Sequence, residues 1–314
     1  MRKLLCLIAL VSCVATLDLS AQTKAAAPAK KAAVPVKAAP AKTPAAPPQK
    51  PKGSISKNPY IGAITLDADT GKIFFEDKAD VPGYPASTLK LMTLLVIQEK
   101  IDAGQVKLTD MVSVSVKAYK TGGSQVWLDP KETFSVEDML YALMIKSAND
   151  VAVALAEHVA GTTEAFVDLM NAKAAQLGMK NTRFASVHGL PPSEGQKQDI
   201  TTARDMGILC VELCKHPAIF EYTSTPERKF RDESSKAAVD MTTHNPFLKK
   251  GQRIEGCDGL KTGWTVQAGY SIAVTCKRNG KRVIVVVLGS ETLAVRDAKA
   301  KELLNQALAQ QAQP

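Results

Sequence analysis

The sequence predicts a mixed α/β domain of the α+β type, with one antiparallel sheet built from both ends of the domain and an all-helical segment between them. Three observations lead to this expectation. Runs with a period of two, rich in β-branched and aromatic residues, occur between residues 60 and 76. The same period returns after Ile254. Between these regions, apolar residues recur with a helical period instead.

Five strands are predicted, two near the start of the domain and three near its end. The first two flank Asp69-Thr70-Gly71, a turn signal that favours a hairpin. The last three follow one another closely enough to form a meander. The predicted strands are residues 60–66, 72–76, 259–265, 269–276 and 282–288.

Helices are predicted where apolar residues repeat every three or four positions next to a capping residue. Ser135 and Asp138 resemble a capping box, and the helix that follows them should end near Ser147. Gly161 and Gly178 stand where a helix commonly stops. The other predicted helices are residues 87–100, 151–160, 163–177, 201–215 and 293–309.

Three short motifs occur in the order S-x-x-K, S-x-N and K-T-G, the series of serine acyl-enzymes that act without a histidine base. They are Ser87-Thr88-Leu89-Lys90, Ser147-Ala148-Asn149 and Lys261-Thr262-Gly263. Further copies at residues 54–58 and 120–122 lie in a lysine-rich linker and a glycine loop. Order and context therefore select the first set.

The first motif predicts a nucleophile and its general base. Ser87 and Lys90 are three residues apart on a predicted helix, so their side chains share a face. A serine hydroxyl needs a base to take its proton. Lysine can be that base only when burial or a second cation, here Lys261, lowers its pKa. The helix N-terminus at Ser87 also favours developing negative charge.

The other two motifs predict a proton relay and a substrate-binding strand. Ser147 could carry a proton between Lys90 and the leaving amine. Asn149 could offer a donor and an acceptor to a peptide amide of the substrate. Lys261 and Thr262 suit a carboxylate, by charge and by hydroxyl hydrogen bond.

Two further residues on that strand have predicted roles. Gly263 leaves room for close approach of the substrate backbone. The N–H of Trp264 could complete an oxyanion hole with the N–H of Ser87. None of the cysteines has metal-ligand spacing, and no metal or other cofactor is expected.

From about Tyr60 to Leu304 the chain resembles the low-molecular-mass penicillin-binding proteins, the serine D-alanyl-D-alanine carboxypeptidases of peptidase family S11. The resemblance implies a β-lactamase/transpeptidase-like fold, an antiparallel sheet flanked by helices with an all-helical lobe. It implies removal of the terminal D-Ala from peptidoglycan stem pentapeptides through an acyl-serine, with β-lactam antibiotics as inhibitors. Beyond the three motifs it rests on residues 85–90, 122–124, 181–184, 187–190, 202–206 and 258–263.

Other functions must be weighed against a carboxypeptidase. A D,D-endopeptidase that cleaves peptidoglycan crosslinks would use the same residues. A class A-like β-lactamase would need a Glu-x-x-x-Asn loop, and neither Glu164 nor Glu194 has an Asn four residues later. A non-catalytic wall-binding relative would have a broken site, whereas all catalytic positions are intact here. Arg296 resembles a basic position near the substrate carboxylate in relatives.

The net charge of +9 belongs to the N-terminal segment. Residues 1–58 hold ten basic residues and one acidic residue, which leaves 30 of each in residues 59–314. A balanced domain gives no indication of nucleic-acid binding. Residues 22–58 are almost entirely Ala, Pro and Lys and should be a disordered linker before a domain at 59–310. Tethering to an anionic wall or membrane is the alternative role for this linker.

Residues 1–21 predict a signal peptide, with an apolar stretch from Leu4 to Leu17 too short to span a bilayer and cleavage after Ala21. Lipidation of Cys13 is the alternative processing. We therefore expect an exported protein, periplasmic or associated with the cell envelope. Any membrane attachment should be through this signal or a lipid on Cys13.

The remaining cysteines predict two pairs. Cys210 and Cys214 are four apart in a helical pattern and should be free thiols. If the last hairpin turns on Val266-Gln267, Cys257 and Cys276 face each other and could form a disulfide. A bulge near Trp264 would separate them, so both outcomes stay open.

Overall fold

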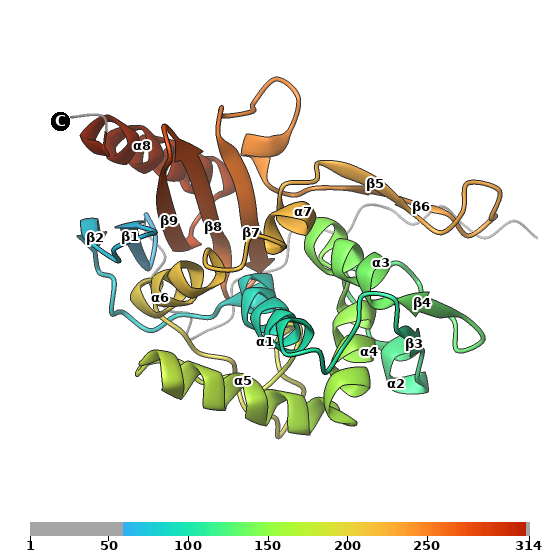
Figure 1. The fold of residues 1–314 in the computed structure, drawn as a ribbon. Helices are drawn as coiled ribbons and strands as arrows, with labels where there is room; N and C mark the ends of the chain where they lie inside the picture. The colour runs from blue at the N-terminus through green and yellow to red at the C-terminus, as the bar shows by residue number, and fades with distance from the viewer. Residues whose placement is uncertain (1–58, 312–314) are drawn as a thin grey trace, which may run out of the picture. The chain divides into compact units, whose positions relative to one another are not determined.

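The central sheet contains five antiparallel strands in the order β2-β1-β9-β8-β7 (Figure 1). The structure, a computed structural model, describes residues 59–311. The predicted signal peptide, the linker and Cys13 lie outside the described residues. The strands are β1 (Gly62–Asp67), β2 (Ile73–Asp77), β7 (Cys257–Thr265), β8 (Gly269–Arg278) and β9 (Lys281–Ser290).

The sheet joins both ends of the domain, as the sequence predicts. β1 pairs with β9 from Gly62 opposite Leu288 to Asp67 opposite Val283. β1 also forms the predicted hairpin with β2, and β7, β8 and β9 form the meander. β7 is the outer strand at one side of this sheet. One of its edges is therefore not paired with another strand, a position at which a peptide can add.

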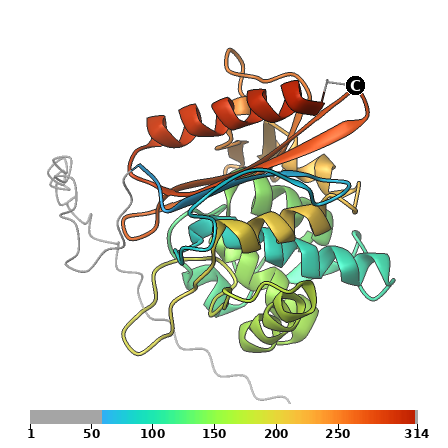
Figure 2. The ribbon, with the colours of Figure 1, turned by 90° about the vertical axis from the view of Figure 1, so that its left-hand side faces the viewer.

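The two faces of the sheet are covered differently (Figure 2). Alternate residues of β9 separate them: Val283, Val285 and Val287 pack with α8 (Leu293–Gln311) on one face. Ile284, Val286 and Leu288 join the core formed with the helical lobe on the other face. β9 is therefore apolar on both sides, as a central strand must be.

The helical lobe contains the helices predicted between the two groups of strands and two short helices that were not predicted. Ser135 caps its helix by accepting from Asp138 N, and Gly178 ends another in the left-handed conformation with φ of 77°. The helices are α1 (Lys90–Asp102), α2 (Val116–Lys120), α3 (Val136–Tyr141), α4 (Asn149–Ala160), α5 (Thr163–Leu177), α6 (Ala203–Leu213) and α7 (Ile219–Thr223).

The short strands and helices of the lobe were not predicted from the sequence. Two small two-stranded antiparallel sheets lie in the lobe. One pairs β3 (Met111–Ser113) with β4 (Thr133–Ser135), and the other is a hairpin of β5 (Glu227–Phe230) and β6 (Val239–Thr242). Strands of three or four residues hold too few positions for an alternating pattern to emerge. The short helices α2 and α7 lack a helical pattern for the same reason.

The last hairpin has a different register from the one assumed for the cysteine pair. Thr265 pairs with Gly269 across a three-residue loop, which shifts the ladder by one residue. A bulge between Cys257 and Gly259 shifts it back, so that Cys257 pairs with Cys276 after all. The predicted opposition is confirmed for a different reason. The thiols are free, as are those of Cys210 and Cys214.

Within residues 59–311, no helix is both long enough and apolar enough to cross a bilayer.

Candidate active site

Ser87 and Lys90 lie at the junction between the sheet and the helical lobe. Ser87 belongs to a 3₁₀ turn, η1 (Ala86–Leu89), and Lys90 is the first residue of α1. The sequence predicted one helix from residue 87, but a tighter turn precedes it. In a 3₁₀ turn, side chains three apart eclipse each other. The Lys90 Nζ consequently lies 3.2 Å from Ser87 Oγ.

Lys90 is completely buried and has three polar contacts. Its Nζ donates to Asn149 Oδ1 at 2.7 Å and to the carbonyl of His188 at 2.8 Å, and it lies 3.2 Å from Ser87 Oγ. A neutral amine has two hydrogens for the first two partners and a lone pair for the Ser87 hydroxyl. Burial, helped by the charge of Lys261, places the pKa of Lys90 well below its usual range. A lysine in this position can accept a proton near neutral pH, as a general base must.

The His188 loop has a structural part in the site. The side chain of Asp199 accepts from the N–H groups of Ala185 and Ser186 and thereby holds the loop that carries the His188 carbonyl. Burial and the charge of Lys90 lower the pKa of His188 to about 4. Its imidazole is therefore neutral at pH 7, which agrees with Nδ1 accepting from Leu190 N at 3.1 Å.

Asn149 supports Lys90, which differs from the role predicted for it. Its Oδ1 accepts from Lys90, and its Nδ2 donates to the carbonyl of Gly122 at 2.8 Å. The Asn149 N–H also donates to the carbonyl of Ser124. The amide side chain is buried between these partners. Here it joins the base to the loop that carries Ser124.

Ser147 occupies a strained position. A π-helical turn, η2 (Ala142–Lys146), ends at Ser147, whose φ of 63° lies in the left-handed region. Such turns are frequent at functional sites, and a left-handed serine needs support from its surroundings. The Ser147 hydroxyl is buried and has no hydrogen-bond partner among the described residues. It is therefore free to bond to a substrate atom.

Lys261 lies on β7 and is buried. Its Nζ donates to the carbonyl of Thr262 at 3.1 Å. Burial, and then the charge of Arg296, lower the pKa of Lys261 to about 7. The Arg296 guanidinium is also buried and pairs with Asp297 at 2.6 Å. Two cations thus lie near Thr262, and only one has a carboxylate partner in the described chain.

An open cavity of about 390 Å³ adjoins these residues. Five of the eight predicted site residues line it, while Lys90, Asn149 and Lys261 lie behind its wall. Ser124, His244, Lys249, Tyr270 and Leu293 line it without having been predicted. Of these, only Ser124 belongs to a stretch with a family resemblance. The lining residues are Ser87, Ser124, Ser147, His244, Lys249, Thr262, Gly263, Trp264, Tyr270, Leu293 and Arg296.

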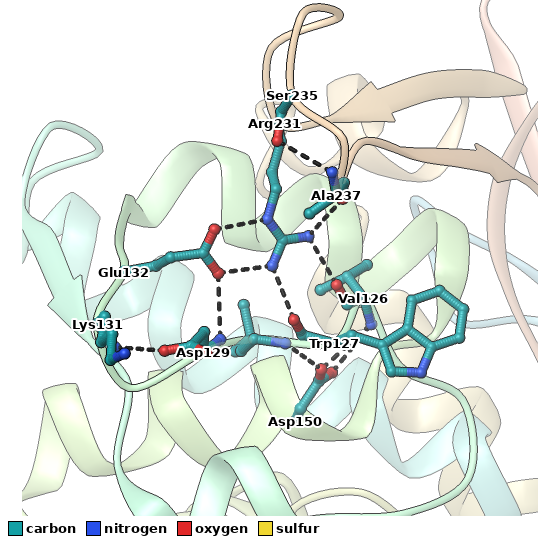
Figure 3. Close-up of polar contacts among 10 residues, drawn as sticks. Val126, Trp127, Asp129, Lys131, Glu132, Asp150, Arg231, Ser235 and Ala237 are labelled. Atoms are coloured by element: carbon teal, nitrogen blue, oxygen red, sulfur yellow. Dashed lines mark hydrogen bonds and ion pairs between the residues drawn. The ribbon is translucent and has the colours of Figure 1, made fainter. Parts of the chain in front are cut away.

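The loop that carries Ser124 is fixed from two sides (Figure 3). Asp150, next to Asn149, accepts from the N–H groups of Val126 and Leu128. From the opposite side, Arg231 donates to the carbonyls of Val126 and Trp127, at 2.8 Å each. The guanidinium also forms a two-point ion pair with Glu132. The wall of the cavity is therefore attached to both the base and the β5–β6 hairpin.

The two additional copies of the motifs stand outside this constellation. Residues 54–58 lie outside the described part of the chain. Lys120-Thr121-Gly122 is at the end of α2, and only the Gly122 carbonyl reaches the site, through Asn149.

A five-stranded sheet with one helix behind it, a helical lobe before it and a Ser–Lys pair between them defines a penicillin-binding, β-lactamase-like protein. The D-alanyl-D-alanine carboxypeptidase family, peptidase family S11, matches residues 54–292, more than half of the chain. The chain therefore belongs to this family.

Individual relatives agree with this assignment. D-alanyl-D-alanine carboxypeptidase DacF of Bacillus subtilis is 38% identical over 248 residues, which are 79% of this chain; the chain spans 62% of the length of DacF. The crystal structure of DacD from Francisella tularensis matches with a TM-score of 0.72 and 29% identity, over 83% of this chain and 74% of that one. Penicillin-binding protein D2 from Listeria monocytogenes, in its ampicillin-bound form, matches with a TM-score of 0.67 and 30% identity, over 78% and 95%.

Proposed function

We propose that this protein is a serine D-alanyl-D-alanine carboxypeptidase that removes the terminal D-Ala from peptidoglycan stem pentapeptides and is inhibited by β-lactams. The single observation that carries the proposal is the 3.2 Å contact between the buried Lys90 Nζ and Ser87 Oγ beside an open cavity. The ampicillin-bound relative supports the β-lactam part.

Acylation begins with proton transfer from Ser87 to Lys90. The Ser87 Oγ then attacks the carbonyl carbon of the penultimate D-Ala. The N–H groups of Ser87 and Trp264 are the proposed donors to the oxyanion, which they stabilise most when charge develops on it. Collapse of the tetrahedral intermediate breaks the peptide bond. The proton passes from Lys90 through Ser147 to the departing amine.

The terminal carboxylate of the substrate binds on the β7 side of the cavity. The Thr262 hydroxyl can donate to it, while Lys261 and Arg296 supply positive charge from positions that are buried before substrate arrives. Charge-assisted hydrogen bonds in such a site are stronger than neutral ones. This arrangement favours a peptide that ends at the residue after the scissile bond.

Deacylation reverses the proton path. Lys90 takes a proton from water, the water oxygen attacks the ester carbonyl, and the ester C–O bond breaks. The proton returns to Ser87 Oγ. No Glu-x-x-x-Asn loop is needed, because one base serves both halves of the reaction.

Two measurements test the proposal: covalent labelling with a fluorescent penicillin, and the rate of D-Ala release from peptide substrates. Wild-type protein should acquire one label, on Ser87, and release D-Ala from a pentapeptide monomer faster than it cleaves a crosslinked dimer. The Ser87→Ala variant should do neither. Equal labelling of that variant would refute Ser87 as the nucleophile, and faster cleavage of the dimer would make the protein an endopeptidase.

Export is a separate part of the proposal and rests on sequence alone. Residues 1–21 would direct the chain to the periplasm or cell envelope, with residues 22–58 as a spacer. Mass spectrometry of the mature N-terminus tests this: a terminus at Gln22 supports signal-peptide cleavage, and a lipidated Cys13 supports the alternative. An uncleaved, cytoplasmic chain would contradict both.

A further inference from the structure

Trp127 is a large aromatic residue that is exposed to solvent. Its side chain is 63% exposed, and its φ of 54° is in the left-handed region, which is costly for a bulky residue. The indole points away from the polar cluster around Arg231 (Figure 3). An exposed tryptophan in a strained conformation suggests a binding role, because folding alone would favour neither feature.

The strain is fixed by the contacts on either side of this residue. Asp150 holds the N–H groups that precede and follow Trp127, and Arg231 holds its carbonyl. The Arg231 side chain is only 5% exposed, so its ion pair with Glu132 is shielded from water on that side. The backbone from which the indole projects is consequently fixed before any ligand arrives, which lowers the entropic cost of binding.

The Lys146 ammonium group lies beside this ring and has no ion-pair partner among the described residues. Its Nζ is 5.8 Å from the centroid of the Trp127 ring. Among the described residues it has no carboxylate within ion-pair distance, although it is partly buried. Its charge also acts on His244, which lines the cavity. A half-buried cation without a partner is suited to an anionic group of a ligand.

Trp127 and Lys146 are close in sequence to two lining residues of the cavity, although they do not line it themselves. Ser124, in the same loop as Trp127, and Ser147, next to Lys146, are lining residues. Thr262 and Arg296, which we assign to the terminal carboxylate, belong to β7 and α8 instead. The pair therefore adjoins the part of the cavity that is left for the rest of an extended substrate.

We propose that Trp127 and Lys146 form a subsite for the acyl side of the peptide, upstream of the acylated D-Ala. The indole packs against the peptide chain, and the Lys146 ammonium binds a carboxylate carried by an upstream residue. The inference rests on the proposed carboxypeptidase function and adds to it a preference for an acidic stem peptide.

Three substrates with the same D-alanyl-D-alanine end test the subsite on the full-length protein. One is a short N-acetylated peptide whose only carboxylate is the terminal one. The second is longer and carries an upstream carboxylate, and the third has that carboxylate converted to an amide. Wild type should prefer the second over the third by about twofold to fivefold in kcat/KM, the upper part of the range for an exposed ion pair.

Variants then separate the two contributions. Lys146→Gln should abolish the preference for the acid over the amide. Trp127→Ala should lower the ratio of kcat/KM for the long amide over the short peptide, and Trp127→Phe should restore most of it. Lys180→Gln and Tyr119→Ala, which alter an exposed lysine and an exposed aromatic elsewhere, should leave both ratios at their wild-type values.

The outcomes distinguish the subsite from the reaction. If wild type hydrolyses all three peptides equally, or if Lys146→Gln keeps the preference, the subsite is wrong and the carboxypeptidase proposal stands. If wild type neither hydrolyses any peptide nor binds penicillin, both fail. Penicillin labelling of every variant shows that Ser87 is still correctly placed, so that a misfolded variant is recognised.

Discussion

Gly263 on β7 is in backbone contact with the turn that carries Ser87. A Cβ placed on Gly263 would lie 3.0 Å from the Ser87 nitrogen and 2.9 Å from the carbonyl oxygen of Pro85. Neither atom belongs to a flexible side chain, so neither can yield cheaply. The absence of a side chain is what lets the strand with Lys261 come close enough to depress the pKa of Lys90.

Gly263→Ala should therefore damage the site itself. The added methyl group must push η1 and β7 apart, which we expect to slow penicillin acylation at least tenfold and to cost about 1–3 kcal/mol of stability. Gly122→Ala is the matched control, because a Cβ there meets nothing within 4 Å. Stopped-flow acylation and thermal melts measure both. An unchanged acylation rate in Gly263→Ala would show that this contact is not needed.

Lys90→Arg tests the base while keeping a cation. Arginine cannot lose its proton in a protein, so it cannot accept one from Ser87. We expect kcat/KM for pentapeptide to fall by about 10²–10⁴, the usual range for loss of a general base. Lys90→Met should be equally inactive, because it also lacks a base. It differs from Lys90→Arg in that it leaves no buried charge in the site. Substantial acylation in both variants would mean that another group takes the proton.

The pH dependence of KM should follow Lys261. Its pKa of about 7 lies below the ordinary value of 10.5, so it is charged below pH 7 and neutral above. The KM for a free-carboxylate substrate should rise as pH increases through 7. The same peptide with an amidated C-terminus is the control, and its KM should stay flat. A KM independent of pH for the free acid would remove Lys261 from carboxylate binding.

The lowered pKa of Lys261 should also affect how the free energy of unfolding depends on pH. Its pKa is lower in the folded state, so between pH 7 and 10.5 the unfolded chain binds more protons at this site. Stability should therefore gain a contribution from this residue as pH rises through that range. Urea unfolding of wild type and Lys261→Met at several pH values measures it. A pH slope equal in the two proteins would contradict the prediction.

Arg231→Lys should destabilise the lobe. The buried guanidinium donates to Glu132 and to backbone carbonyls of the Trp127 loop, and an ammonium cannot reproduce this planar geometry. We expect a loss of about 2–4 kcal/mol in chemical unfolding. Lys229→Gln, which breaks an exposed ion pair with Glu233 in the same region, should change the stability far less. Equal losses of stability in the two variants would mean that the buried contacts of Arg231 contribute no more than an exposed ion pair does.

Cys257 and Cys276 should both be alkylated in denatured protein that has not been reduced. Their thiols contact carbonyls, Cys276 Sγ that of Glu255 at 3.1 Å, and burial raises the pKa of Cys257 to about 12. Little thiolate is then present to enter disulfide exchange. Peptide mapping after alkylation gives the answer, and a peptide pair linked through these two residues would contradict it.

The elements and motif residues of this protein could be predicted because their signals are local. The β-branched and apolar runs of β7 to β9 and the caps at Ser135 and Gly178 depend only on neighbours in sequence. A lowered pKa of Lys90 and its two causes, burial and the charge of Lys261, could be proposed. The contacts of its Nζ with Asn149 and the His188 carbonyl could not, because these residues lie far away in sequence.

Features that depend on contacts between distant segments could not be predicted. The contacts of Asn149 with Lys90 and Gly122 exist only because the fold brings these residues together. The predicted contact of Asn149 with a substrate amide stays a prediction. His244 and Tyr270 line the cavity from segments without any motif. The register at Cys257 depended on a loop of three residues and a compensating bulge, and neither has a sequence signature.

The closure of the sheet by β1 and β9 has a consequence for how the active protein is made. A chain synthesised as far as Lys215 already contains Ser87, Lys90 and Ser147, but it lacks β7 and also β9, which pairs with β1 in the sheet. Contacts between segments so far apart in sequence form late and slowly. The protein should therefore become able to react with a penicillin only after the last third of the polypeptide has paired with the first strands. An incomplete chain contains the nucleophile Ser87 but should not be acylated.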